Sequence, residues 1–117
     1  MSTNQVLIVD DEKNIRLTVA KALESINLQA DTAINGEEAL QKLVTNRYRL
    51  IFLDLKMPGI SGLETLTKIR AQWPDIRVVM ITAHGTIDAA VEAMKMGAPD
   101  FLQKPFSKKI LAKKIRD

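Results

Sequence analysis

The chain has 117 residues, a length that fits one compact domain, and it contains no cysteine, which excludes disulfides and thiol chemistry. No apolar run approaches the roughly 20 residues of a membrane-spanning helix, and the first residues, MSTNQ, lack the features of a signal peptide. The net charge is +3, but residues 107–117, with four lysines, one arginine and one aspartate, carry +4 by themselves. Without aromatic or glycine-rich recognition elements, this segment predicts a solvated helix face and no nucleic-acid binding. We expect a cytoplasmic protein with no membrane contact.

Five short, mostly apolar runs recur along the chain. They lie at residues 5–9, 29–34, 50–53, 77–81 and 100–103. Three of them are continuously apolar, which is typical of strands whose two faces are both covered, as in a parallel sheet.

The segments that follow these runs have the apolar spacing of amphipathic helices. The expected stripes are Ile15, Val19, Ala22, Leu23 and Ile26; Ala39, Leu40, Leu43 and Val44; Leu63, Leu66 and Ile69; Ile87, Ala90, Val91 and Met94; and Ile110, Leu111 and Ile115. Strands that alternate with helices predict an α/β fold with right-handed crossovers. We therefore predict a doubly wound, flavodoxin-like parallel sheet of five strands in the order 2-1-3-4-5, with five helices.

Polar residues follow four of the predicted strands at the same edge of this sheet. Asp10 and Asp11 follow the first, Asp54 the third, Thr82 the fourth and Lys104 the fifth. In doubly wound folds, ligands bind outside the carboxyl ends of the strands, at the point where the strand order reverses. We therefore expect these five residues to form one site.

Three carboxylates that converge in a partly desolvated cleft repel one another, and a hard divalent cation such as Mg²⁺ relieves that repulsion. Each acid could instead cap a helix, since aspartate is favoured at that position. Lys104 would add a fixed positive charge and Thr82 a hydroxyl donor, while Asp54 is the best candidate for a nucleophile. Together these groups suit the transfer of a phosphoryl group. Glu12 is expected to be an acid of the first turn of the first helix.

Four motifs carry a family resemblance, in family order and spacing. VLIVDDE, LIFLDLKMPGISGLE, VVMITAHG and GAPDFLQKPF resemble the receiver domain of response regulators in two-component signalling, over essentially the whole chain. The carboxyl-terminal third is most similar to receivers of NtrC-like transcription activators. Such activators usually continue into an ATPase and a DNA-binding domain, so the resemblance implies that residues 1–117 are the receiver domain of a longer regulator.

The resemblance implies a role for each matching residue. Asp54 would be the phosphoacceptor, and Asp11 would bind Mg²⁺ (or Mn²⁺) directly. Asp10 would bind the metal mainly through water, and Asp54 and the backbone carbonyl of Lys56 would complete the protein ligands.

The remaining implied roles concern the phosphorylated state. Lys104 would bind the phosphoryl oxygens, and Thr82 would move to donate a hydrogen bond to them. Phe101 would rotate inward as Thr82 moves, which would change the face made by the fourth helix, fifth strand and fifth helix. The expected partners are a sensor histidine kinase or a small phosphodonor, the output domains, and a second copy of the chain after phosphorylation.

Three other functions fit parts of the sequence. A Mg²⁺-dependent phosphohydrolase with an aspartate nucleophile is the main alternative to a non-enzymatic phosphoacceptor, although no insertion could form a substrate cap. A flavin carrier shares the fold, but the loop DDEKN would repel the cofactor phosphate. A constitutive interaction module would need no phosphoryl chemistry at all.

Overall fold

The computed structural model describes residues 4–55, 57, 59–82, 95, 100–103 and 107–116. The strands are β1 (Val6–Val9), β2 (Ala30–Ala33), β3 (Leu50–Asp54), β4 (Arg77–Thr82) and β5 (Asp100–Gln103). The helices in the described part are α1 (Lys13–Glu24), α2 (Gly36–Thr45), α3 (Gly62–Gln72) and α5 (Lys108–Arg116). The further helix predicted around residues 87–94 lies outside the described residues.

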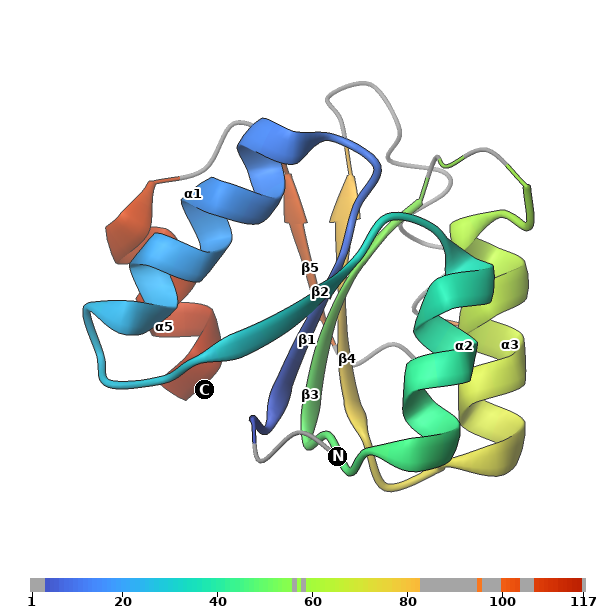
Figure 1. Ribbon diagram of the computed structural model, residues 1–117. Helices are drawn as coiled ribbons and strands as arrows, with labels where there is room; N and C mark the ends of the chain where they lie inside the picture. Colours follow the sequence, from blue (N-terminus) through green and yellow to red (C-terminus); the bar gives the residue numbers. More distant parts are fainter. Residues whose placement is uncertain are drawn as a thin grey trace.

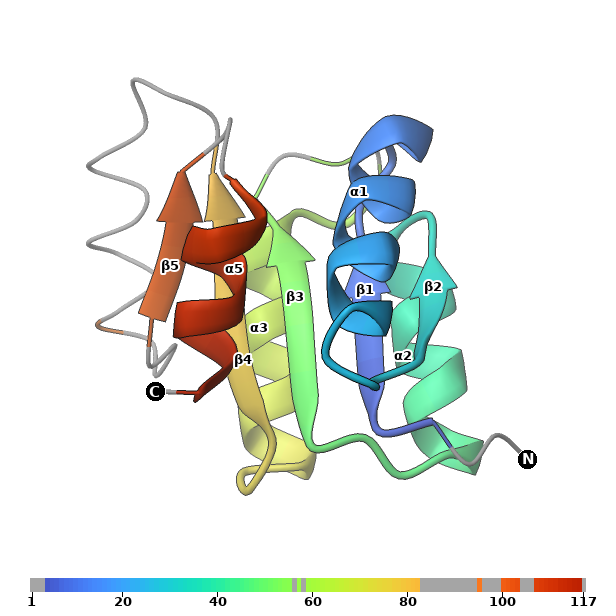
Figure 2. The ribbon, with the colours of Figure 1, turned by 90° about the vertical axis from the view of Figure 1, so that its left-hand side faces the viewer.

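The strands form one sheet in the order β2-β1-β3-β4-β5, and every pairing is parallel. This confirms the predicted topology. Figures 1 and 2 show α1 and α5 on one face of the sheet and α2 and α3 on the other. Among the described residues, no helix has the length and apolar character needed to cross a membrane.

Burial on both faces explains why the central strands are continuously apolar. Every residue of β1 and β3 is buried. Alternate residues face opposite sides of a strand, so Val9 and Leu53 pack toward α2 and α3, whereas Ile8 and Phe52 pack toward α1 and α5. Each fully buried side chain of this size contributes about 2 kcal/mol of hydrophobic stabilisation. A strand with one solvated face would have shown alternation instead.

The helix boundaries follow from local capping. Asn35 accepts a hydrogen bond from the Glu38 backbone N–H at the start of α2, at 2.8 Å. Ser61 does the same for Glu64 at the start of α3, at 3.1 Å. Each bond satisfies a backbone donor that has no partner within its own helix.

Within the described part of the chain, two residues of the predicted apolar stripes are exposed, so their placement in a buried stripe is wrong. Val44 is 74% exposed and Ile110 is 50% exposed. Each lies next to a buried leucine, and one residue turns a helix by about 100°, which carries the neighbouring side chain away from the sheet. Val44 and Ile110 therefore do not share the buried face of the leucines beside them.

Candidate functional site

The carboxyl edge of the sheet brings together residues from β1, β3 and β4. Asp54 is the last residue of β3 and Thr82 the last of β4, while Asp10 directly follows β1. The Asp10 backbone N–H still donates to the carbonyl oxygen of Ala33 at 3.1 Å, so the strand pairing continues through Asp10. Because Val9 pairs with Leu53, the two aspartates are the next residues on adjacent strands.

Asp10 and Asp54 are both buried, with exposed fractions of 0% and 5%. Burial of a carboxylate is costly unless hydrogen bonds or opposite charge compensate it. The Asp10 carboxylate accepts the backbone N–H of Glu12 at 2.8 Å. The Arg16 guanidinium donates to the backbone carbonyl of Asp10 at 2.9 Å, which ties the edge to the first turns of α1.

Three consecutive acids form a cluster at the end of β1. Oxygens of Asp10, Asp11 and Glu12 lie within 4.8 Å of one another, with Asp10 buried and the other two exposed. Glu12 was expected in the first turn of a helix, and this expectation is wrong: α1 begins at Lys13, and Glu12 occupies the position before it, without a side-chain capping bond. Its backbone is extended there, and its carboxylate faces the two aspartates.

The donor set of this edge fits a hard divalent cation. It consists of carboxylate oxygens of Asp10, Asp11 and Glu12, and Asp54 ends the neighbouring strand. Mg²⁺ and Mn²⁺ prefer such oxygen ligands, and Mg²⁺ usually takes one or two carboxylates and keeps several waters.

The turn after β3 is packed tightly against Asp54. The Gly62 backbone N–H donates to the Leu55 carbonyl at 3.1 Å, and the Leu55 N–H donates to Ile81 of β4 at 3.1 Å. A Cβ atom at Gly62 would clash with the carbonyl oxygen of Asp54. Glycine is therefore required at Gly62 so that the start of α3 can lie against the candidate nucleophile.

Three of the predicted site residues fall wholly or partly outside the part of the chain that the structure describes. Lys56 and Lys104 lie outside the described residues, and for Thr82 the structure describes the backbone at the end of β4. Phe101 lies on β5 with its side chain 39% exposed, and its backbone N–H donates to Asp100 at 2.8 Å. The roles predicted for these four residues stay predictions.

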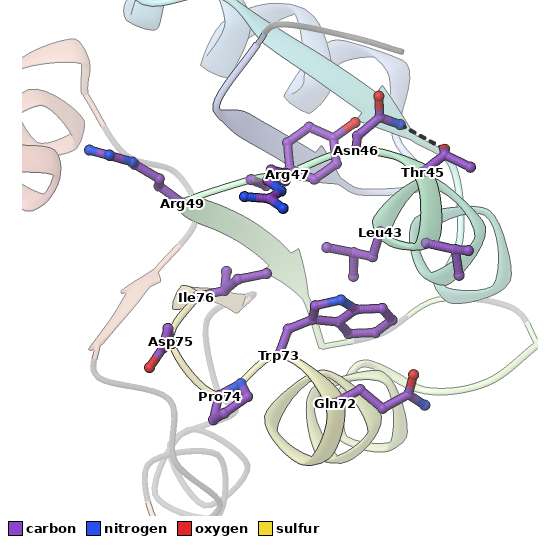
Figure 3. A pocket seen from close by; sticks show the side chains of 12 residues that line it. Leu43, Thr45, Asn46, Arg47, Arg49, Gln72, Trp73, Pro74, Asp75 and Ile76 are labelled. Atoms are coloured by element: carbon purple, nitrogen blue, oxygen red, sulfur yellow. Dashed lines mark hydrogen bonds between the residues drawn. The ribbon is translucent and has the colours of Figure 1, made fainter.

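A hollow lies at the opposite edge of the sheet, where β3 and β4 begin. Figure 3 shows Trp73 and Arg47 directed toward this cavity of about 820 Å³, which Leu43 and Ile76 also line. Its lining residues come from the ends of α2 and α3 and the loops that follow them. The hollow is separated from the acidic cluster by the length of β3 and contributes nothing to it.

Comparison with known proteins gives a consistent result. Residues 6–116 match the model of the response regulator receiver domain. The chain is 44% identical over 106 residues to the nitrogen assimilation regulatory protein NtrX of Azorhizobium caulinodans, covering 89% of this chain and 23% of that protein. It is 39% identical over 106 residues to the transcriptional regulator NtrC of Escherichia coli K12, covering 91% and 23%. The chain thus spans about a quarter of the length of these curated relatives.

Solved structures agree with these matches. The NtrX receiver domain from Brucella abortus superposes with a TM-score of 0.92 at 39% identity, covering 95% of this chain and 94% of that one. The chemotaxis response regulator CheY4 of Vibrio cholerae superposes with a TM-score of 0.89 at 31% identity, covering 98% of each chain.

Proposed function

This chain belongs to the response regulator receiver domain family, and from that premise we propose that Asp54 accepts a phosphoryl group. Receiver domains are phosphoacceptor signalling modules of two-component systems rather than conventional enzymes. The observation that carries the proposal is the position of Asp54, a buried carboxylate at the end of a central strand, next to the strand that ends in the acidic cluster.

In the proposed reaction, a carboxylate oxygen of Asp54 attacks the phosphorus of a phosphohistidine on a sensor kinase, or of a small phosphodonor. The bond between phosphorus and the donor atom breaks, the donor leaves with that electron pair, and an acyl phosphate forms on Asp54. Mg²⁺ or Mn²⁺, held by Asp10, Asp11, Asp54 and the carbonyl of Lys56, would neutralise charge between the carboxylate and the phosphoryl oxygens.

Two further residues complete the proposed site. Lys104 would pair with a phosphoryl oxygen, and the Thr82 hydroxyl would donate to another. Phosphorylation adds about two negative charges and three acceptor oxygens, which would draw both residues toward Asp54. Phe101, whose side chain is 39% exposed, would then turn inward. Such a population shift would alter the face that includes β5 and α5.

We also propose that residues 1–117 are the receiver domain of a longer NtrC-like or NtrX-like regulator. The support is the coverage of 23% of each full-length relative. Its partners would be a sensor histidine kinase, ATPase and DNA-binding output domains, and a second copy of the receiver after phosphorylation.

The central test uses acetyl phosphate as donor. The protein is incubated with acetyl phosphate and Mg²⁺, and its intact mass is measured over time. The wild type should gain one phosphoryl group, Asp54→Asn should gain none, and Asp75→Asn, an exposed acid at the opposite edge, should behave as the wild type. Loss of the gain in Asp75→Asn, or its retention in Asp54→Asn, would contradict the assignment. Repeated turnover of phosphate esters would favour the phosphohydrolase instead.

A further inference from the structure

Glu37, in the first turn of α2, reaches across to the turn that follows β3. Its carboxylate Oε1 accepts the backbone N–H of Ile60 at 2.9 Å, although the two residues are 23 positions apart in sequence. The acceptance of this backbone hydrogen bond lowers the pKa of Glu37 below its ordinary value of 4.5, so the carboxylate is ionised at neutral pH. The bond is therefore charge-assisted, although it is exposed to solvent.

The turn is shaped to receive this carboxylate. Gly59, the residue before Ile60, has φ = +81°, a conformation that glycine adopts without strain. A Cβ atom at Gly59 would lie 2.5 Å from the Glu37 Oε1 atom. A side chain at this position would therefore push the carboxylate away from the Ile60 N–H.

The same turn is held at two other points. Ile60 packs against the start of α2 so closely that a Cβ atom at Gly36 would lie 2.7 Å from the Ile60 Cγ1 atom. At its far end, Gly62 lies against the carbonyl oxygen of Asp54. Residues 59–62 thus form a short bridge from the first turn of α2 to the backbone of Asp54.

We propose that Glu37 is a positioning residue for the phosphoacceptor: it holds residues 59–62 in place and thereby fixes the backbone of Asp54, against which Gly62 lies. The inference rests on the proposed function of Asp54. Reaction rates and metal binding depend on sub-ångström placement of the groups involved, so loosening the turn should impair both.

A purely structural role for Glu37 is the main competitor. An acid in the first turn of a helix interacts favourably with the helix dipole. Glu38 is also in the first turn of α2, and its side chain pairs with Lys42 at 3.7 Å rather than with the turn. Glu38→Ala is therefore a matched control, because it removes the same charge from the same helix end and leaves the Ile60 bond intact.

The experiment compares Glu37→Ala, Glu37→Gln and Glu38→Ala in the whole chain. Three quantities are measured: melting temperature by circular dichroism, Mg²⁺ affinity by calorimetry, and the rate of phosphoryl gain from acetyl phosphate by intact mass. We expect Glu37→Ala to lower the rate roughly three- to tenfold and to weaken Mg²⁺ binding, with a melting temperature close to that of Glu38→Ala. Glu37→Gln keeps a neutral acceptor and should recover part of the loss.

Gly59→Ala provides a second variant, because it should displace Glu37 without altering it, and it also strains the backbone of the turn at φ = +81°. The double variant Glu37→Ala/Gly59→Ala should lose less of the phosphorylation rate than the product of the two single-variant losses. Such non-additivity is expected of two residues that act through one contact. Equal rates and Mg²⁺ affinities for Glu37→Ala and Glu38→Ala would overturn the inference. If the wild type gained no phosphoryl group while Glu37→Ala still weakened Mg²⁺ binding, the positioning role would stand and the proposed function would fail.

Discussion

Replacement of Asp11 by asparagine should stabilise the metal-free protein. The oxygens of Asp10, Asp11 and Glu12 lie within 4.8 Å of one another, and Asp11 is exposed. At that separation and the permittivity of water, each like-charge pair costs roughly 0.9 kcal/mol. Asp11 has two such neighbours, and physiological salt about halves the effect. Part of this repulsion persists in the unfolded chain, where the three acids are still consecutive, so Asp11→Asn should gain at most about 1 kcal/mol, or about 4 °C in melting temperature for a chain of this size.

Addition of Mg²⁺ should make the wild type melt at a higher temperature than Asp11→Asn. A ligand that binds only the folded state stabilises it by about 2.7 kcal/mol at a hundred times its Kd, which is roughly 10 °C here. Asp11→Asn lacks a carboxylate that we propose as a direct ligand, so it should gain much less. The variant would then melt above the wild type in EDTA and below it in MgCl₂.

Thermal unfolding followed by circular dichroism, in EDTA and over a MgCl₂ series, measures both effects. Asp75→Asn makes the same change in net charge at an exposed position outside the cluster, and it should shift neither the metal-free stability nor the response to Mg²⁺. If Asp11→Asn were less stable than the wild type in EDTA, the electrostatic reasoning would be wrong. If it gained as much from Mg²⁺ as the wild type, the assignment of Asp11 as a ligand would be wrong.

Three other substitutions test the packing and the turn. Tyr48→Phe removes the 2.6 Å hydrogen bond from the tyrosine hydroxyl to Asp31 and should cost about 1.5 kcal/mol by urea unfolding. Burial, and secondly the neighbouring Asp31, raise the pKa of Tyr48 above its ordinary value of 10.0, so the stabilisation by the tyrosine hydroxyl is fully present below pH 10. The difference in free energy of unfolding between the wild type and Tyr48→Phe should shrink as the pH rises above 10. Leu111→Ala empties a fully buried site and should lower the free energy of unfolding by about 3 kcal/mol in the same assay. Gly62→Ala, whose Cβ would meet the Asp54 carbonyl, should slow phosphoryl gain by about tenfold or more in the intact-mass assay.

The sheet could be predicted because its strongest signals are local. Continuous apolar runs at residues 6–9 and 50–53 indicate strands buried on both faces, and the alternation of strands with helical segments implies parallel crossovers. Val44 and Ile110 were misplaced because adjacent apolar residues on a helix satisfy the periodicity equally well. Only the packing of each helix on the sheet decides which of the two is buried.

The sequence predicted which residues lie at this edge of the sheet, but it did not predict which side-chain contacts they make. Asp10 and Asp54 share an edge because strand order and register place them there. Glu12 was misassigned because a one-residue difference in the helix start decides whether its carboxylate belongs to the helix or to the cluster. The contact between Glu37 and Ile60 joins distant segments, and no local pattern indicates which acid an exposed backbone N–H will meet.

The two edges of the sheet differ in the contacts that their charged residues make. Three carboxylates gather at the carboxyl edge of the sheet, those of Asp10, Asp11 and Glu12. At the amino edge, hydrogen bonds stabilise the charged side chains. The Asp31 carboxylate accepts from Tyr48 at 2.6 Å and from Asn4 at 2.9 Å, and the Arg77 guanidinium donates to the last carbonyls of α5. A guanidinium at a helix carboxyl end is also favoured by the helix dipole. Binding of the proposed cation would relieve the repulsion between the acids at the carboxyl edge, and the free energy released on binding would be available to reshape the turns around Asp54.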